Sequence, residues 1–516
     1  MAPASSRTPS GKTADFKLPT RHSRPPSFAI RRALVKAKAD LNMIAAPFMI
    51  SDFFKSNRPG VLYASLFMLA IATLLGGASR TDVFAPLAVR LAAIGVIMWL
   101  VWTRPPGQFG LRWIHWLLLA GIVAVPLLQL TPLPFGTWST LPGREIPKSL
   151  FDILGERPAH PISIAPDRTL NSALALLPAV AAFLLGRLLD SDGRNSLLAL
   201  TLLLCLFSAA LGLLQVAAGP GSALYFYAIT NRDAGVGLFS NANHQSLFLA
   251  IGIVLVFAWI GRLIEQRRTV PRGPAIGAIL MLALLYLSII GTNSRAGAIM
   301  SVVAFVGGFA LLPLRRAGVP RWLIGTALGL PLVTMVAAGA LLLTGVVLKD
   351  RFQVTHVDES RIDHLPIFRR MVSDQFPVGS GLGTFDPLYR SYETPDTLTF
   401  AYLNAAHNDY AQLAIEGGAA AIALLAIFVI WWLMRFMAAW RGIVGNREIY
   451  RDIQRQGRAA SLVTLLALVH SAADYPLRTA AILTLFAFMC AMLESPPSGA
   501  RSHRPRVARS PAAAPQ

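Results

Sequence analysis

Residues 196–218 read SLLALTLLLCLFSAALGLLQVAA, an apolar run that contains no charged side chain. A helix of about 20 such residues is long enough to cross the roughly 30 Å hydrocarbon core of a membrane. The run is rich in Leu and Ala, and it lacks the alternation of polar and apolar residues that membrane β-barrel strands show. This stretch therefore predicts a membrane-spanning helix.

Runs of the same kind recur along the chain, which has 516 residues, 54% of them hydrophobic and only 14% charged. Soluble domains carry roughly a quarter of charged residues, so this composition and the mean hydropathy of +0.54 exclude most of them. We expect an all-α polytopic membrane protein with about twelve transmembrane helices. The predicted spans are 61–79, 83–103, 112–131, 170–189, 196–218, 244–262, 274–292, 295–314, 322–347, 418–437, 459–474 and 478–494.

Lysine and arginine predict the orientation of these spans. The net charge of +21 would suggest a nucleic-acid partner in a soluble protein. Here the basic residues follow the membrane instead: with both termini in the cytoplasm, 32 of the 47 Lys and Arg lie on that side. Nucleic-acid binding requires aromatic residues interleaved on a shaped surface, whereas these two ends are rich in Pro, Ser and Ala. We expect no nucleic acid, and both termini in the cytoplasm.

The chain divides into five predicted regions. They are a basic cytoplasmic segment with an amphipathic helix (1–58), an N-terminal transmembrane half (59–220), a region of polar motifs (221–480), a last transmembrane helix (481–495) and a disordered basic tail (496–516). The amphipathic helix is expected at 27–56. Cys205 and Cys490 both lie inside apolar runs, so they provide neither a disulfide framework nor a zinc motif.

Three segments outside the membrane are long: 132–169, 219–243 and 348–417. The last lies between the ninth and tenth spans and contains ten acids and six bases. Loops on a rigid scaffold commonly carry binding and catalysis, so we expect most of the functional residues in and around this large loop.

The second outside segment ends in a polar motif. Residues 231–244 read NRDAGVGLFSNANH, whose glycines and asparagines favour a tightly folded loop. Arg232 would lie at the membrane face. Asn241 or Asn243 could simply cap the helix that follows, which is the plainer interpretation.

A second motif joins the seventh and eighth spans. Residues 291–297 read GTNSRAG, so Ser294 can cap the next helix and Arg295 lies at the edge of the bilayer. A charge there costs roughly 2.5–3.5 kcal/mol, and a helix N-terminus attracts anions, so Arg295 predicts an anion site. The alternative is an arginine that reaches lipid phosphate. Arg90, in the second span, is another buried cation whose role the sequence leaves open.

The large loop begins with a predicted amphipathic helix with an early proline, Pro366, and apolar residues at helical spacing. Its polar face holds Arg369, and Arg361 lies just before it. The stretch FPVGSGLGTF (376–385) follows as a Gly-rich turn. No βαβ unit surrounds it, so it is not a dinucleotide motif, and we expect its backbone to approach another element or a ligand closely.

The loop ends in NAAHNDYAQLAIEGG (404–418), which predicts a short helix that meets the tenth span. If Asn404 caps this helix, His407 lies in its first turn and shares a face with Tyr410. A histidine at the membrane surface suits a general base, although a single histidine is more often structural. Asn408 and Asp409 flank it. A metal site of His407, Asp409, Asp374 and His364 is conceivable but lacks a recognisable ligand spacing.

The junction of the last two spans is also polar. His470 and Asp474 are spaced i, i+4, so on one helix they could form a hydrogen bond, and Arg478 follows. The plainer interpretation is a structural polar lock at the mouth of the bundle.

Five stretches, in this order, resemble the O-antigen ligase and polysaccharide polymerase superfamily of bacterial membrane glycosyltransferases. They are NRDAGVGLFSNANHQS, GTNSRAGA, RIDHLPIFRRMVSDQFPVGSGLGTFDPLY, NAAHNDYAQLAIEGG and HSAADYPLRTAA. The first 220 residues agree only as a generic multispan half, so the resemblance identifies residues 221–480 as an O-antigen ligase-like catalytic region. It does not separate ligase from polymerase.

The resemblance implies transfer of a glycan from undecaprenyl diphosphate on the periplasmic face of the bacterial inner membrane, with neither metal nor nucleotide as cofactor. By motif match, His407 is the base, and the diphosphate-binding candidates are Arg295, Arg232, Arg361 and Arg369. The supporting residues are Asn243, Ser294, Asn408, Asp409, Tyr410, His470, Asp474 and Arg478. The acceptor would be the lipid A core, a growing glycan or a protein hydroxyl, and membrane lipids surround the chain.

Two other classes of function are open. A lipid-linked glycan transporter would require broken helices and charged sites near mid-bilayer, whereas the polar groups here cluster at one face. A non-enzymatic assembly subunit would not need Arg295 and His407 together.

Overall fold

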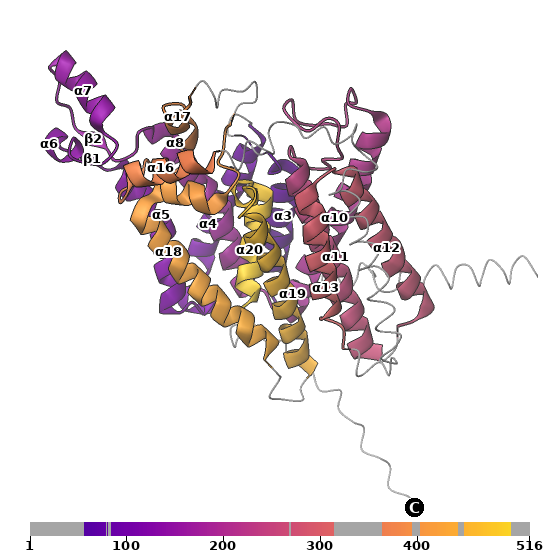
Figure 1. Ribbon diagram of the computed structural model, residues 1–516. Coiled ribbons are helices and arrows are strands. Elements are labelled where there is room, and N and C mark those ends of the chain that lie inside the picture. The colour runs from indigo at the N-terminus through magenta and orange to yellow at the C-terminus, as the bar shows by residue number, and fades with distance from the viewer. Residues whose placement is uncertain are drawn as a thin grey trace, which may run out of the picture. The chain divides into compact units, whose positions relative to one another are not determined.

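The computed structural model describes residues 56–78, 80, 84–267, 270–313, 364–394, 403–441 and 448–496. Helices dominate these residues, and Figure 1 shows long helices lying side by side. The elements are α3 (Pro59–Leu75), α4 (Ala85–Thr103), η2 (Pro106–Phe109), α5 (Trp113–Leu130), β1 (Pro132–Leu133), α6 (Phe135–Trp138), α7 (Glu145–Leu154), β2 (His160–Pro161), α8 (Pro166–Ala175), α9 (Leu177–Leu188), α10 (Ser191–Ala218), α11 (Ala242–Arg267), α12 (Arg272–Gly291), α13 (Arg295–Phe309), α16 (Leu365–Gln375), α17 (Phe385–Tyr389), α18 (Asp409–Trp440), α19 (Glu448–His470), η3 (Pro476–Arg478) and α20 (Ala480–Met492).

Seven helical segments are long and apolar enough to cross a membrane, which confirms a helical membrane protein. They are α4, α5, α8 with α9, α10, α11, α12 and α18. Three predicted spans correspond to the shorter apolar helices α3, α13 and α20. The span expected at 459–474 falls in α19, whose first half is charged, and the one expected at 322–347 lies outside the described residues. The total of twelve therefore stays a prediction.

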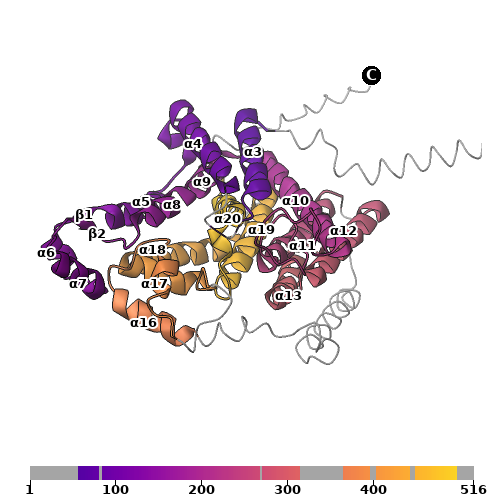
Figure 2. The same cartoon turned by 90° about the horizontal axis from the view of Figure 1, so that it is seen from above.

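Helix α11 forms the centre of the bundle. It packs against α10, α12, α13 and α19, as the view from above in Figure 2 shows. Its middle part is apolar on all faces, and Leu247, Phe248 and Val254 are almost completely buried. Helix α20 packs in turn against α9, α19 and α3. This packing holds the first turn of α11 and the last turn of α19, beside which the polar motifs lie.

The outside segment 132–169 is partly folded rather than an open loop. Strands β1 and β2 form a short antiparallel pair, and α6 and α7 lie between them in the sequence. Phe135, Trp138, Phe151 and His160 pack together, with ring centroids 4.6–6.1 Å apart. The span expected to begin at residue 170 starts earlier, because Pro166 opens α8.

Two predicted terminal features cannot be compared with the structure. Most of the amphipathic helix expected at 27–56 lies outside the described residues, and so does the tail from residue 497 onward. Both remain predictions from the sequence.

Candidate functional site

His407 lies immediately before α18, and not inside a helix as the sequence suggested. Asn408, rather than Asn404, is the N-cap, and its side chain accepts hydrogen bonds from the backbone N–H groups of Tyr410 and Ala411. His407 itself has φ +48°, in the left-handed region that non-glycine residues rarely adopt. Such a conformation costs of order 1–3 kcal/mol and persists only when its surroundings hold it.

Asp474 holds the imidazole of His407. Its Oδ1 lies 3.1 Å from His407 Nδ1 and also accepts the backbone N–H of Tyr475 at 2.9 Å. Burial alone would raise the pKa of Asp474, but the hydrogen bond from His407 and the nearby imidazoles of His244 and His470 lower it well below its usual range. An ionised carboxylate only accepts hydrogen bonds, so Nδ1 of His407 carries the proton. Its Nε2 is therefore left as the basic nitrogen.

Aromatic packing fixes the ring further. The ring of Tyr475 meets His407 edge-on, with centroids 4.9 Å apart, and meets His244 in the same way at 5.1 Å. His244 is fully buried, with Nε2 3.9 Å from Asp474. The side-chain hydrogen bond expected between His470 and Asp474 is not formed, although the backbone N–H of Asp474 donates to the carbonyl of His470 at 2.9 Å. Asp474 turns its side chain to His407 and Asn243 instead.

The second oxygen of Asp474 connects this group to α13. Asn243 donates to Asp474 Oδ2 at 2.7 Å, and its own Oδ1 accepts from Ser294 at 2.7 Å. Ser294 is the N-cap of α13, as predicted, and accepts the N–H of Gly297 at 2.9 Å. A continuous series of hydrogen bonds thus joins His407 to the first turn of α13. The capping role considered for Asn243 belongs to Asn241, which accepts the N–H of Asn243 at 2.8 Å.

Arg295 is the first residue of α13, and its side chain is exposed. It forms no ion pair with any other residue that the structure describes. The helix N-terminus carries partial positive charge at the same place, so guanidinium and helix together attract an anion. Asn293, two residues before, is the other described non-glycine residue with positive φ, at +53°.

Arg232 belongs to a loop that contacts the same turn. The carbonyl of Asp233 accepts from Asn293 Nδ2 at 3.4 Å, and Gly235 donates to the carbonyl of Gly291 at 2.8 Å. The exposed guanidinium of Arg232 donates to Pro220 O at 3.1 Å and lies over the ring of Tyr225. The structure thus brings the loops of Arg232 and Arg295 together.

Arg478 braces the segment that carries His407. It lies in η3 and contacts Asp409 at 3.3 Å and Glu416 at 3.2 Å, both on the first turns of α18. Ser471 donates to Asp409 at 2.9 Å, and Tyr410 donates to the carbonyl of Leu468 at 2.6 Å. Asn408 donates to the carbonyl of Ala472 at 3.0 Å. The four supporting residues Asn408, Asp409, Tyr410 and Arg478 therefore fix α18 to the end of α19.

Sequence reasoning missed Glu416, which is fully buried and accepts from Gln412 and from the backbone of Phe385 as well as from Arg478. The available signal was an acid at the start of an apolar run. It also missed Arg144, whose fully buried guanidinium donates to Gln375 at 3.0 Å. Burial lowers the pKa of Arg144 to about 10.

The Gly-rich turn approaches other elements closely. Gly379, Gly381 and Gly383 all have positive φ. A Cβ on Gly379 would lie 2.4 Å from the carbonyl oxygen of Glu416, and one on Gly381 would lie 2.5 Å from Ser163 Oγ. The turn is therefore a close-packed support for the start of α18.

The amphipathic helix expected after Leu365 is confirmed as α16, with Pro366 in its first turn and Phe368 and Met371 buried. Arg369 is exposed on it and forms no ion pair with another described residue. Arg361 lies outside the described residues. These two arginines stay predictions as diphosphate ligands.

Two remaining hypotheses can be compared with the geometry. The conceivable metal ligands have separate partners: His407 contacts Asp474, Asp409 contacts Arg478, and Asp374 accepts from Tyr392 at 3.0 Å. Arg90 donates to Asn171 at 2.5 Å, which gives this intramembrane cation a partner on α8.

The assembled group has an imidazole, a carboxylate that orients it, and an exposed arginine at a helix N-terminus. Such an arrangement can remove a proton from a hydroxyl and stabilise a phosphate-bearing leaving group. Comparison with protein families matches residues 278–426 to the O-antigen ligase family. No curated protein matches the chain. The matched region contains Arg295 and His407, whereas Asn243 and Asp474 lie outside it.

Proposed function

We propose that this chain, a member of the O-antigen ligase-like superfamily by its residues 278–426, transfers a glycan from undecaprenyl diphosphate to an acceptor hydroxyl. The family match supports a ligase- or polymerase-type membrane enzyme of polysaccharide biosynthesis. The donor, the acceptor and the periplasmic location are part of the proposal. The reaction class follows from the chemistry of the residues around His407.

One observation carries the proposal: the hydrogen-bond series from His407 through Asp474 and Asn243 to Ser294. Three links connect the only imidazole of the large loop's second half to the helix turn that presents Arg295. A structural lock would not need an exposed arginine at its end. A transferase needs a base and an anion-binding group held at a fixed separation.

The acceptor hydroxyl would meet His407 at Nε2, since Asp474 occupies Nδ1. As its oxygen attacks the anomeric carbon, the proton passes to Nε2 and a new glycosidic bond forms. The bond from the anomeric carbon to the diphosphate oxygen breaks, and the diphosphate leaves with the electron pair. Asp474 then stabilises the imidazolium, which returns its proton to water. A general base of this kind contributes about 10²–10⁴-fold.

Arg295 would stabilise the negative charge that develops on the departing diphosphate. A guanidinium stays protonated and offers two parallel donors to phosphate oxygens. The N-terminus of α13 adds to this potential, and Arg232 can turn from its own loop toward the same anion. The activated donor supplies the driving force.

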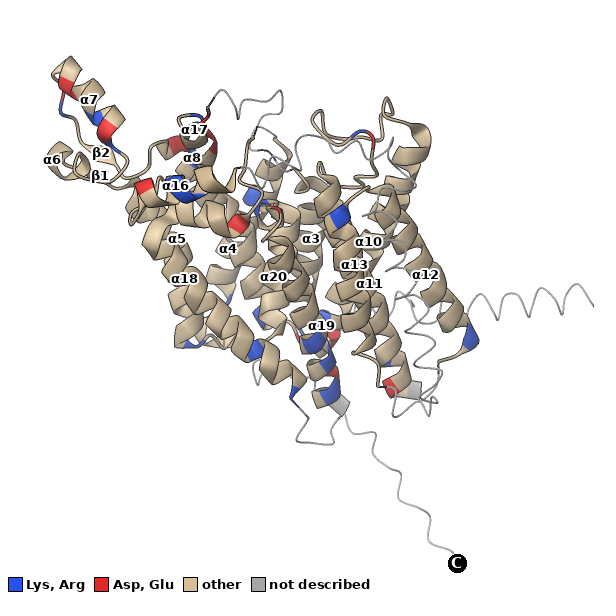
Figure 3. Cartoon of the chain, in the orientation of Figure 1, with Lys and Arg blue, Asp and Glu red and all other residues tan. Residues whose placement is uncertain are grey.

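Charge distribution supports a periplasmic location for this site. Figure 3 shows Lys and Arg at the lower ends of α12, α18 and α19, opposite the end where α16 and α17 lie. An excess of basic residues marks the cytoplasmic side of membrane proteins. We therefore propose an inner-membrane protein with His407 and Arg295 at its periplasmic face.

The decisive experiment is the glycan profile of a deletion strain complemented with wild type or with His407→Ala. Loss of capped lipopolysaccharide with free lipid-linked polymer retained identifies a ligase, and accumulation of single repeat units identifies a polymerase. Normal glycan profiles in the His407→Ala strain, at equal protein level, would refute the base assignment. Lipid-linked glycan that stays on the cytoplasmic leaflet would support transport instead.

A further inference from the structure

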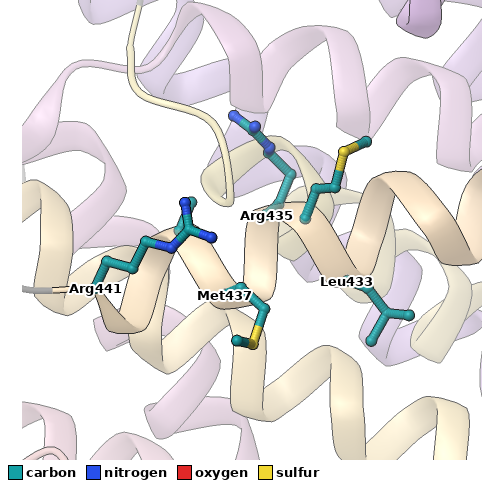
Figure 4. Close-up of a pocket in the computed structure, with 6 residues that line it drawn as sticks. Leu433, Arg435, Met437 and Arg441 are labelled. Carbon is teal, nitrogen blue, oxygen red and sulfur yellow. The ribbon is translucent and has the colours of Figure 1, made fainter.

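The end of α18 opposite His407 carries a pocket of about 400 Å³. It is lined by Leu433, Met434, Arg435, Met437, Ala438 and Arg441. Met434, Ala438 and Arg441 are spaced i, i+4, i+7, so they share one face of the helix, and the small Ala438 leaves room between two long side chains. Figure 4 shows the guanidinium groups of Arg435 and Arg441 on the same side of α18.

The apolar lining faces outward. Leu433, Met434 and Met437 are 47%, 51% and 55% exposed, on a helix long and apolar enough to span a membrane. Exposed side chains of this kind on such a helix contact lipid chains, so the pocket opens toward the lipid and not toward a soluble partner.

The pocket also has an excess of positive charge. Glu494 contacts the pocket residue Arg435, but its carboxylate also contacts Arg112 at 2.5 Å and His115 at 3.3 Å. Arg435 reaches the same carboxylate at 3.6 Å, and its buried Nε has no hydrogen-bond acceptor among the described residues. The exposed Arg441 forms no ion pair within the described part of the chain. Glu494 thus contacts two guanidinium groups, and of these only Arg435 lines the pocket, where Arg441 adds a second positive charge.

Aromatic residues lie at the same level of α18 as the pocket, on the face that packs against α19. Trp432, Phe436 and Trp440 follow one another along α18 with ring centroids 5.3 and 6.3 Å apart. Trp440 donates its indole N–H to Ser461, and Arg458 lies over its ring at 5.3 Å. Tryptophan with nearby basic residues is typical of the membrane–water interface.

We propose that this pocket binds an anionic glycerophospholipid, with the headgroup phosphate held by Arg435 and Arg441 and an acyl chain against Leu433, Met434 and Met437. The two guanidinium groups can donate charge-assisted hydrogen bonds to a phosphate, and the apolar side chains can contact an acyl chain. A neutral headgroup would leave the excess charge unmatched, and free phosphate would leave the apolar wall uncovered. In the orientation proposed above, the lipid belongs to the cytoplasmic leaflet.

The test is native mass spectrometry of the detergent-purified full chain with phosphatidylglycerol or phosphatidylcholine. We expect wild type to retain phosphatidylglycerol preferentially, and Arg435→Gln/Arg441→Gln to bind it at least about tenfold more weakly. Arg272→Gln is the matched control, since Arg272 is an exposed arginine at the corresponding end of α12 outside the pocket. Arg441→Gln alone, which leaves the contact of Arg435 with Glu494 intact, should weaken binding too.

Three results would overturn the proposal. The first is equal retention of the two lipids by wild type, and the second is unchanged phosphatidylglycerol binding by both pocket variants. The third is displacement of the lipid by millimolar inorganic phosphate, which would assign the arginines to a free anion. Loss of binding in Arg272→Gln as large as in the double variant would show general surface attraction and would also refute a defined site.

Discussion

Replacement of Asp474 by Asn removes one charge and keeps the shape of the side chain. In wild type, Oδ1 accepts from His407 and from the backbone of Tyr475, and Oδ2 accepts from Asn243 at 2.7 Å. An amide has only one oxygen, so it can satisfy one of these two sides. The substitution therefore tests whether the hydrogen bonds of Asp474 to His407 and Asn243 are needed for glycan transfer.

Both orientations of the new amide disturb the site. If its oxygen faces His407, its NH₂ meets the NH₂ of Asn243, which must then rotate and lose its bond from Ser294. If its NH₂ faces His407 instead, the ring must accept at Nδ1 and carry its proton on Nε2, where it can no longer act as a base. A hydrogen bond to a charged group is worth about 1.5–3 kcal/mol, and a general base about 10²–10⁴-fold.

We expect Asp474→Asn to lower kcat for glycan transfer by about 10²–10³-fold, with a much smaller change in KM. The assay is transfer of lipid-linked glycan to acceptor by purified protein in lipid nanodiscs. Asp152→Asn is the matched control, since this exposed carboxylate pairs with Lys148 on the surface of α7. A kcat within threefold of wild type, for Asp474→Asn protein that melts normally, would refute the role of Asp474 in orienting His407.

Three other predictions concern charge, packing and pH. Arg295→Lys should lower kcat by about 10²–10³-fold with little effect on melting temperature, because an ammonium cannot offer the two parallel N–H donors of a guanidinium. Wild-type turnover by this variant would contradict the prediction. Gly379→Ala should lower the melting temperature by several degrees, since its Cβ would lie 2.4 Å from the carbonyl of Glu416, whereas Gly277→Ala, with no atom within 4 Å, should not. The stability difference between wild type and Asp474→Asn should shrink as pH falls below about 4. The pKa of Asp474 is lowered in the folded chain, so the stabilisation that its carboxylate supplies is complete above the ordinary value of about 3.9 and is lost as pH falls below it; a difference that does not shrink down to about pH 2 would contradict the lowered pKa.

The helices of the fold could be predicted because a membrane makes the pattern simple. An apolar run such as 196–218 can satisfy its backbone in lipid only as a helix, and α10 begins and ends close to it. Helix α16 and the cap at Ser294 were also predictable, because each depends on neighbouring residues alone. Local rules therefore succeeded wherever the partner was close in sequence.

The contacts of the site could not be predicted in the same way. His407 meets Asp474 and Asn243 meets Ser294 across 67 and 51 positions of the chain, and no spacing rule relates such residues. The expected side-chain hydrogen bond between His470 and Asp474 was wrong because the carboxylate of Asp474 bonds to His407 and Asn243, which are distant in sequence. A local rule placed the N-cap at Asn404, whereas packing of Asp409 against Ser471 and Arg478 favours a start at Asn408.

The strained backbone at the site gives a reason for this long-range bracing. The two non-glycine residues with positive φ in the described chain are His407 and Asn293, one beside each end of the hydrogen-bond series. Each costs of order 1–3 kcal/mol, so neither would persist without the cap at Asn408, the ion pairs of Arg478 and the cap at Ser294. Bracing of this kind fixes the imidazole and the first turn of α13 before any substrate arrives. Electrostatic stabilisation is largest when the groups need not reorganise during the reaction, so the strain is consistent with a preorganised transferase.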